Sequence, residues 1–149
     1  MRVPLIAAAL LLTASAATAA DGLVTVRSAN TPRETLDRFE AVAKSKGMKI
    51  FGRIDHAAGA RSIGQELRPT ELLIFGNPQG GTPLMACAQS AGIDLPLKAL
   101  AWQDASGQVW LAYHDPAWLA TRHGTGECGG VAAKMRSALD AFAKQATGK

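Results

Sequence analysis

The amino-acid sequence predicts one α+β domain, with a single antiparallel-dominated sheet of about five strands and helices on one face of the sheet. Three observations support this fold class. Apolar segments of strand length recur along the chain, two longer segments have the apolar period of a helix, and one turn-rich segment joins consecutive strands. The elements follow the order strand, helix, strand, short helix, strand, short helix, two strands and helix, which is typical of a sheet covered by helices. The sequence shows no internal repeat and no second domain.

The first helix has the clearest boundaries. Thr31 suits the N-cap, Pro32 suits the first helical position, and Glu34 completes a capping box with Thr31. Gly47 suits the left-handed residue that follows a helix. The apolar stripe of this helix comprises Leu36, Phe39, Val42 and Ala43.

Strands are expected on both sides of this helix and again after it. Residues 23–28 predict a strand with one buried face, and a right-handed crossover through the helix leaves it parallel to a second strand at 48–55. Residues 56–67 predict a short helix that Pro69 ends. The apolar run 72–75 predicts a strand that is buried on both faces.

The second half of the chain begins with a glycine-rich segment, 76–81, that predicts a mobile turn. Thr82 and Pro83 then cap a short helix that reaches about residue 88. The remaining elements are a hairpin with strands at 98–103 and 108–113 around a turn at 104–107, one or two helical turns at 116–122, and a final helix at about 131–144 with Val131, Met135, Leu139 and Phe142 on its apolar face.

The first twenty residues predict a cleaved signal peptide, which leaves residues 21–149 as the mature domain. Arg2 provides a positive start, an uninterrupted apolar run follows, and small residues precede the cleavage point. The alternative is an uncleaved membrane anchor, which the high share of alanine, serine and threonine in this segment disfavours. The leader therefore indicates a periplasmic or secreted bacterial protein without membrane contact after cleavage.

The net positive charge of the mature domain is small. The whole chain carries a net charge of +4, and the loss of Arg2 with the signal leaves +3. Four basic residues do lie close together, but export argues against a nucleic-acid partner, and such a group is more typical of a solvated face. These residues are Lys44, Lys46, Lys49 and Arg53.

Cys87 and Cys128 are the two cysteines of the chain. In an oxidising compartment they favour a structural disulfide, while two inert buried thiols and a redox pair are the alternatives. Redox chemistry is the weakest of the three because the sequence has no C-x-x-C motif.

Several strings of the sequence carry a resemblance to a known family. They are Arg53-Ile54-Asp55-His56-Ala57-Ala58, Glu71-Leu72-Leu73-Ile74-Phe75-Gly76-Asn77-Pro78, Gly81-Thr82-Pro83-Leu84-Met85, Ile93-Asp94-Leu95-Pro96-Leu97-Lys98, Tyr113-His114-Asp115-Pro116 and Arg122-His123. In this order and spacing they resemble the bacterial family called domain of unknown function 302. The resemblance covers residues from about 24 to 143, and it implies a curved antiparallel sheet with helices packed against one side, similar to one repeat of the TATA-box-binding protein. It implies no activity, and the two cysteines depart from the family pattern, which argues against a shared catalytic cysteine.

Polar residues are expected to gather at one end of the sheet. If strands two to five alternate in direction, the end of the third, the start of the fourth and the end of the fifth share one rim. An amide, carboxylates, a phenol and an imidazole in such a rim can bind a polar ligand or relay a proton. The same residue types also form turns and cap backbone N–H groups, which is the structural alternative. The ligand-binding candidates are Asn77, Asp94, Tyr113, His114 and Asp115.

A second candidate pair, Asp55 and His56, is expected at the opposite end of the sheet. Asp55 also suits an N-cap, which accounts for the aspartate but leaves His56 free. A carboxylate that orients an imidazole is a usual arrangement of a general base, so Asp55, His56 and His114 are the catalytic candidates.

Metal and cofactor sites are not expected. His56, His114 and His123 have no shared helical spacing, and the sequence has no nucleophile elbow, phosphate loop or H-E-x-x-H motif. The three tryptophans can line an apolar pocket, although aromatic residues on strands are more often core or cross-strand pairs. They are Trp102, Trp110 and Trp118.

These observations favour a binding or accessory module that holds a small ligand or contacts a protein partner. One alternative is a small hydrolase or isomerase that uses His56 or His114 as a general base. Another is a structural, stress-protective homodimer formed through the sheet. Binding is favoured over catalysis because no nucleophile has an obvious activating base in the sequence.

We expect the mature protein to begin at Ala20 or Asp21, because cleavage after Ala19 and after Ala20 both fit the small-x-small rule. N-terminal sequencing of the protein recovered from the periplasm checks this, with the cytoplasmic fraction as the control for uncleaved precursor. A periplasmic protein that retains Met1 would contradict the cleavage.

Overall fold

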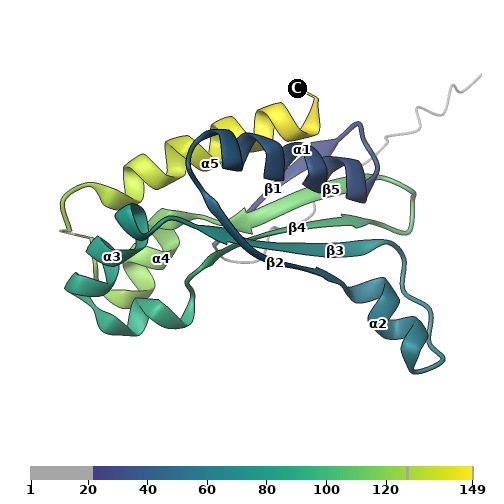
Figure 1. Ribbon diagram of the computed structural model, residues 1–149, viewed down its shortest axis with the longest axis horizontal. Coiled ribbons are helices and arrows are strands. Elements are labelled where there is room, and N and C mark those ends of the chain that lie inside the picture. The colour runs from purple at the N-terminus through teal and green to yellow at the C-terminus, as the bar shows by residue number, and fades with distance from the viewer. Residues whose placement is uncertain (1–21, 127, 149) are drawn as a thin grey trace, which may run out of the picture.

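The computed structural model describes residues 22–126 and 128–148, and a five-stranded antiparallel sheet organises them (Figure 1). The strand order is β1-β5-β4-β3-β2, and each neighbouring pair is antiparallel. The predicted signal peptide lies outside the described residues. The strands are β1 (Leu23–Ser28), β2 (Lys49–Asp55), β3 (Thr70–Gly76), β4 (Leu97–Gln103) and β5 (Val109–His114).

Helices follow most strands along the chain. Figure 1 shows α1 and α5 lying across one face of the sheet, α3 and α4 together at one end, and α2 at the other end. The α+β class, the single antiparallel sheet and the helical cover are as predicted. The helices are α1 (Pro32–Ser45), α2 (His56–Ser62), α3 (Pro78–Cys87), the 3-10 helix η1 (Gln89–Ile93), α4 (Pro116–His123) and α5 (Val131–Thr147).

The core lies between the sheet and the pair α1 and α5. Phe39 of α1 packs edge-on against Phe75 of β3, with ring centroids 5.1 Å apart, and against Phe142 of α5 at 5.8 Å. Leu36 and Leu111 are also fully buried in this cluster. Burial of side chains of this size contributes about 1.5–3 kcal/mol each, so this contact region is a substantial part of the driving force for folding.

The N-terminal boundary of α1 is confirmed in detail. Thr31 accepts a hydrogen bond from the Glu34 backbone N–H, and the Glu34 carboxylate accepts one from the Thr31 backbone N–H at 3.0 Å. The two hydrogen bonds with Thr31 hold the pKa of the Glu34 carboxyl below its usual value. The helix ends next to Gly47, which has φ 78°.

The predicted parallel orientation of the first two strands is correct, but these strands are not neighbours. β1 and β2 form the two edges of the sheet, since β1 pairs with β5 and β2 pairs with β3. The hairpin turn between β4 and β5 is also present. There the Asp104 carboxylate accepts hydrogen bonds from the Ser106 side chain and from the Trp110 indole, which lower the pKa of Asp104 to about 2.

Three predictions about the middle of the chain are wrong. The glycine-rich segment 76–81 is not a mobile turn, because α3 begins at Pro78 and includes both Gly80 and Gly81. The apolar run 72–75 is fully buried on one face only, since Leu72 and Ile74 are partly exposed. The helix expected over 56–67 ends at Ser62, with Ile63 as its C-cap and Gly64 in the left-handed conformation (φ 73°) directly after it. The 3-10 helix η1 was not predicted.

The disulfide between Cys87 and Cys128 is confirmed. Its Cα atoms are 6.3 Å apart, and it joins the end of α3 to the segment between α4 and α5. Both cysteines belong to this bridge, so they are not separate buried thiols.

We expect denatured, non-reduced protein to contain no titratable thiol, and reduced protein to contain two. Replacing both cysteines with serine should lower the free energy of unfolding by about 4 kcal/mol, because the bridge closes a loop between residues 41 positions apart. Chemical denaturation of the oxidised, reduced and double-serine proteins measures this effect. Two free thiols before reduction would contradict the bridge.

Candidate ligand pocket at one end of the sheet

Three strand ends meet at one end of the sheet, as the alternating strand directions predicted. Phe75 near the end of β3 pairs with Leu97 at the start of β4, and Ala99 of β4 pairs with Tyr113 near the end of β5. The long connections that leave and enter these strands carry α3, η1 and α4. Any site built from these connections therefore lies at this end.

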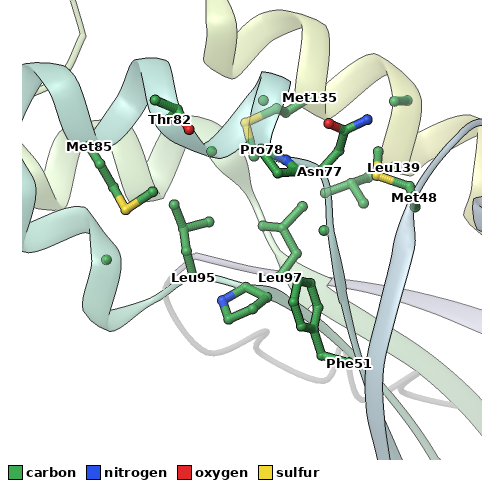
Figure 2. Close-up of a pocket in the computed structure, with 16 residues that line it drawn as sticks. Met48, Phe51, Asn77, Pro78, Thr82, Met85, Leu95, Leu97, Met135 and Leu139 are labelled. Carbon is green, nitrogen blue, oxygen red and sulfur yellow. The ribbon is translucent and has the colours of Figure 1, made fainter.

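A largely apolar pocket of about 390 Å³ opens at this end (Figure 2). Its wall combines the ends of β2, β3 and β4 with α3, η1 and α5, which are distant in sequence. Among the described residues, no charged side chain lines it. The lining comprises Met48, Phe51, Gly76, Asn77, Pro78, Gly80, Gly81, Thr82, Met85, Gly92, Leu95, Pro96, Leu97, Met135, Ala138 and Leu139.

Asn77 positions the α3 wall of the pocket. Its Oδ1 accepts a hydrogen bond from the Gln79 backbone N–H at 2.8 Å, which caps α3, and its Nδ2 donates to the Gly47 carbonyl at 3.2 Å. These two bonds attach the start of α3 to the connection between α1 and β2. A carboxamide has two acceptor lone pairs and two N–H donors, so Asn77 retains hydrogen-bonding capacity for a ligand.

Methionine is the prominent side chain of the wall. Beyond Met1, the chain contains Met48, Met85 and Met135, and all three line the pocket. Figure 2 shows them on different sides of the cavity, with Leu95 and Leu97 between them. Unbranched thioether side chains adapt to ligands of different shape, which is why they are common on promiscuous binding surfaces. These methionines were not predicted as pocket residues, because they share no periodicity that would group them.

Of the five predicted ligand-binding residues, Asn77 is the one that lines this pocket. Tyr113 points into the core instead, where it is 2% exposed and its hydroxyl donates to Asp140 Oδ1 at 2.6 Å. Asp115 caps α4 by accepting from the Ala117 backbone N–H, and it pairs with Arg136 at 3.4 Å. Both side chains therefore have structural partners.

Asp94 forms a separate polar cluster beside the pocket. Its Oδ2 lies 2.6 Å from His123 Nε2 and 3.2 Å from Arg122 Nε, and Ser90 Oγ lies 3.0 Å from the other ring nitrogen of His123. Burial tends to raise the pKa of the Asp94 carboxyl, but the hydrogen bond with His123 and the charge of Arg122 offset it, and the pKa falls below its usual value. Asp94 was predicted as a site residue, but its contacts with His123 and Arg122, and the contact of His123 with Ser90, were not.

His114 has an exposed position next to this cluster. Its ring stacks on Trp118 with centroids 5.1 Å apart, and Arg122 lies over the same indole at 5.2 Å. The other two tryptophans, Trp102 and Trp110, are opposite each other on β4 and β5. The tryptophans are thus a cross-strand pair and a stacking platform, and the pocket lining does not include them.

The predicted Asp55 and His56 pair lies at the opposite end of the sheet. Asp55 caps α2, since its Oδ1 accepts from the Ala58 backbone N–H at 2.8 Å, and its other oxygen is 3.8 Å from Arg61. His56 is exposed. A cavity of about 540 Å³ at this end includes Asp55 and Arg61, but its charged groups already pair with one another.

Residues 22–126 and 128–148 contain no group of three histidine, cysteine, aspartate or glutamate side chains that could hold a metal ion. Within the same residues, no helix has the length and apolar character needed to cross a bilayer.

The sequence model of the family described as "Domain of unknown function DUF302" matches residues 24–142. The chain belongs to this family. The fold is also similar to that of an uncharacterized conserved DUF302 protein from Bacillus stearothermophilus, with a TM-score of 0.76 and 21% identity, over 85% of this chain and 99% of that chain. At this identity the structural likeness shows the fold alone.

Curated relatives from Brucella species have longer chains. This DUF302 chain is 57% identical over 113 residues to proteins named fluoride-specific ion channel FluC 1 in Brucella suis and FluC 2 in Brucella melitensis. The match covers 76% of this chain, but 44% and 42% of those two proteins, respectively. The chain therefore spans less than half the length of these relatives.

We expect the phenol of Tyr113 to resist ionisation in the folded protein. Burial and the Asp140 carboxylate raise its pKa far above the usual value of about 10. The unfolded chain ionises first as pH rises, so the stability that the neutral phenol contributes is complete below about pH 10 and declines above it. Since Tyr113 is the single tyrosine, near-ultraviolet phenolate absorbance reports this residue alone.

The matched control is the same titration in denaturant, where the phenolate should form at about pH 10. Tyr113→Phe should remove the signal and lower the free energy of unfolding at neutral pH by about 1–2 kcal/mol, since a hydrogen bond to a charged group is lost. Equal midpoints for the folded and denatured protein would contradict the buried assignment of Tyr113.

Proposed function

We propose that this DUF302 domain is an exported module that binds a small, predominantly apolar molecule in the pocket between α3, α5 and the sheet. The single observation that carries the proposal is the pocket of about 390 Å³ with its methionine-rich wall. Sites for small molecules are usually mostly apolar cavities of this size range, with a few polar groups that orient the ligand. Here the polar side chains are the Asn77 carboxamide and the Thr82 hydroxyl.

The physical basis of binding is the removal of apolar surface from water. Each Å² of apolar surface that ligand and wall bury together contributes about 25 cal/mol, part of which offsets the entropy lost on association. Phe51 lines the cavity and is 51% exposed. A ligand that covers its ring gains this burial in addition to that inside the pocket.

Export is part of the proposal. The leader-like segment 1–20 suggests passage across the inner membrane, and the Cys87–Cys128 disulfide suits an oxidising compartment such as the periplasm. An apolar pocket in that compartment would carry or sequester a poorly soluble molecule, and the domain would act as an accessory to another protein or to a membrane process.

The name of the Brucella relatives does not suggest the ligand of this pocket. Fluoride is a small, strongly hydrated anion, and its burial requires hydrogen-bond donors or positive charge. The described lining consists mainly of methionine, leucine, proline and glycine, with no charged side chain. We therefore propose an apolar ligand for this pocket, and we do not propose that its residues bind fluoride.

We expect Gly81→Leu to lose binding without loss of stability. Gly81 lies within α3, and a Cβ atom built on it lies 3.5 Å from the Leu95 side chain and 3.9 Å from that of Met85, which both line the pocket. A leucine there occupies space that the ligand would fill, so the affinity should fall at least about tenfold, which corresponds to about 1.4 kcal/mol of binding free energy. Titration with phenylnaphthylamine, a neutral apolar fluorophore, measures the affinity.

Gly59→Leu is the matched control. Gly59 also lies within a helix, α2, but a Cβ atom on it meets nothing within 4 Å and is remote from the pocket. Replacing glycine in either helix should raise helix propensity by up to about 1 kcal/mol, so melting temperatures should not fall. Saturable binding to wild type and Gly59→Leu but not Gly81→Leu supports the pocket; equal binding by all three proteins would refute it.

A further inference from the structure

A continuous chain of side-chain hydrogen bonds links a serine, a histidine and an aspartate beside the pocket. Ser90 Oγ lies 3.0 Å from His123 Nδ1, and His123 Nε2 lies 2.6 Å from Asp94 Oδ2. Ser90 belongs to η1, Asp94 follows η1 directly, and His123 ends α4. A purely structural Asp94 needs only one partner, His123 or Arg122. In this arrangement the imidazole of His123 is also hydrogen-bonded to the Ser90 hydroxyl.

The chemistry of the three groups defines the proton positions. An ionised carboxylate only accepts hydrogen bonds, so the short contact with Asp94 places a proton on His123 Nε2. In the neutral imidazole, Nδ1 then holds a lone pair and accepts the hydroxyl proton of Ser90. This is the state in which a histidine removes a proton from a serine that attacks a substrate.

The surroundings suit this role as well. The His123 side chain is 6% exposed and that of Asp94 is 17% exposed, so their hydrogen bond is shielded from water, while Ser90 is exposed to solvent and accessible to a substrate. Arg122, 3.2 Å from the same Asp94 oxygen, favours the ionised carboxylate. Lys98 donates hydrogen bonds to the carbonyls of Asp94 and Pro96, which fixes the segment that carries the aspartate.

The disulfide holds the two halves of this cluster together. Cys87 precedes Ser90 by three residues, and Cys128 follows His123 by five. The bridge therefore restricts the separation of the η1 segment from the end of α4. This cross-link brings a serine and a histidine that are 33 positions apart into one site.

We propose that Ser90 is a nucleophile for the hydrolysis of carboxylic esters, with His123 as the general base and Asp94 as a positioning residue. Ser90 Oγ bonds to the ester carbonyl carbon while its proton passes to His123 Nδ1. The bond to the alcohol oxygen then breaks, and the alcohol leaves with that proton. Water attacks the resulting acyl-serine, gives its proton to Nδ1, and releases the carboxylic acid as Ser90 regains its hydrogen.

The two ring nitrogens have exchanged roles relative to the serine protease arrangement, in which the serine contacts Nε2 and the aspartate contacts Nδ1. The exchange preserves the function of each group, because either imidazole nitrogen can accept a proton when the other one holds hydrogen. Such constellations are recognised by geometry and roles, not by order in the sequence.

The substrate class rests on the proposed function of the pocket, whereas the nucleophile does not. Gly92 and Leu95 lie in the same short segment as Ser90 and Asp94, and both line the pocket. An ester with an uncharged, apolar acyl group is therefore the matching substrate, because its acyl chain enters the apolar cavity while its carbonyl group remains at the edge.

The test compares hydrolysis of p-nitrophenyl esters with acyl chains from acetyl to octanoyl. Wild type should hydrolyse these esters. Ser90→Ala should lower kcat/KM by about a hundredfold or more, because it removes the nucleophilic hydroxyl that the general base activates. Ser62→Ala is the matched control: Ser62 is an exposed helical serine whose hydroxyl bonds to the Gly59 carbonyl at the opposite end. Its activity should equal that of wild type.

Two further measurements distinguish a role of Ser90 and Asp94 in the reaction from a purely structural role. A fluorophosphonate probe should form an O–P bond with Ser90 and release fluoride, and peptide mass spectrometry should locate the adduct on Ser90. Asp94→Asn should lower kcat with little change in KM, because Asp94 orients His123 and does not contact substrate. A purely structural Asp94 would lower the melting temperature without this change in kcat.

The proposal is overturned if wild type hydrolyses none of the esters, if Ser90→Ala remains as active as Ser62→Ala, or if the probe labels no serine. The pocket hypothesis fails separately. If Gly81→Leu binds phenylnaphthylamine like wild type while Ser90→Ala loses esterase activity, the nucleophile stands and the acyl site lies elsewhere. If Gly81→Leu loses phenylnaphthylamine binding while Ser90→Ala still hydrolyses the esters, the pocket hypothesis stands and the assignment of Ser90 as the nucleophile is wrong.

Discussion

The Cys87–Cys128 disulfide is the constraint on which the candidate site depends, because it joins the two long connections at one end of the sheet. The first connection runs from β3 to β4 and contains α3 and η1, and the second runs from β5 to α5 and contains α4. Hydrogen bonds between strands fix the ends of these connections but not their interiors. The bridge limits how far the interiors can separate, so that both the α3 wall and the Ser90–His123–Asp94 cluster persist.

Local chemistry made much of the fold predictable. The capping box of Thr31 and Glu34, the N-cap at Asp55 and the turn at Asp104 each depend on groups within a few residues, and all three are present. The prediction of a mobile turn over 76–81 failed because contacts distant in the sequence decide the structure there. Gly80, Gly81 and Pro83 disfavour a helix locally, and the packing of Leu84, together with the Asn77 cap and its bond to Gly47, overrides that preference.

The candidate site was predictable only where it follows from strand direction. Alternating strands placed Asn77 and Asp94 at the correct end, but they did not show which partners each side chain meets. Asp94 contacts a histidine 29 positions away, and the pocket collects Met48, Met85 and Met135 from three separate elements. Contacts of this kind arise from tertiary packing and have no period or spacing in the sequence.

The pocket and the hydrogen-bonded cluster also differ in the precision that they require. Apolar contacts are not directional, and a methionine wall adjusts to small displacements with little loss of binding energy. The transfer of a proton from Ser90 to His123 requires a donor–acceptor separation near the observed 3.0 Å, and displacement by 1 Å is enough to lower a rate severely. This explains the distribution of fixed contacts at this end of the sheet. The disulfide, the Lys98 hydrogen bonds and the Asp94 ion pair with Arg122 all restrain the segments that carry the cluster. The α3 wall of the pocket shares the disulfide at the end of the helix and has the Asn77 cap at its start.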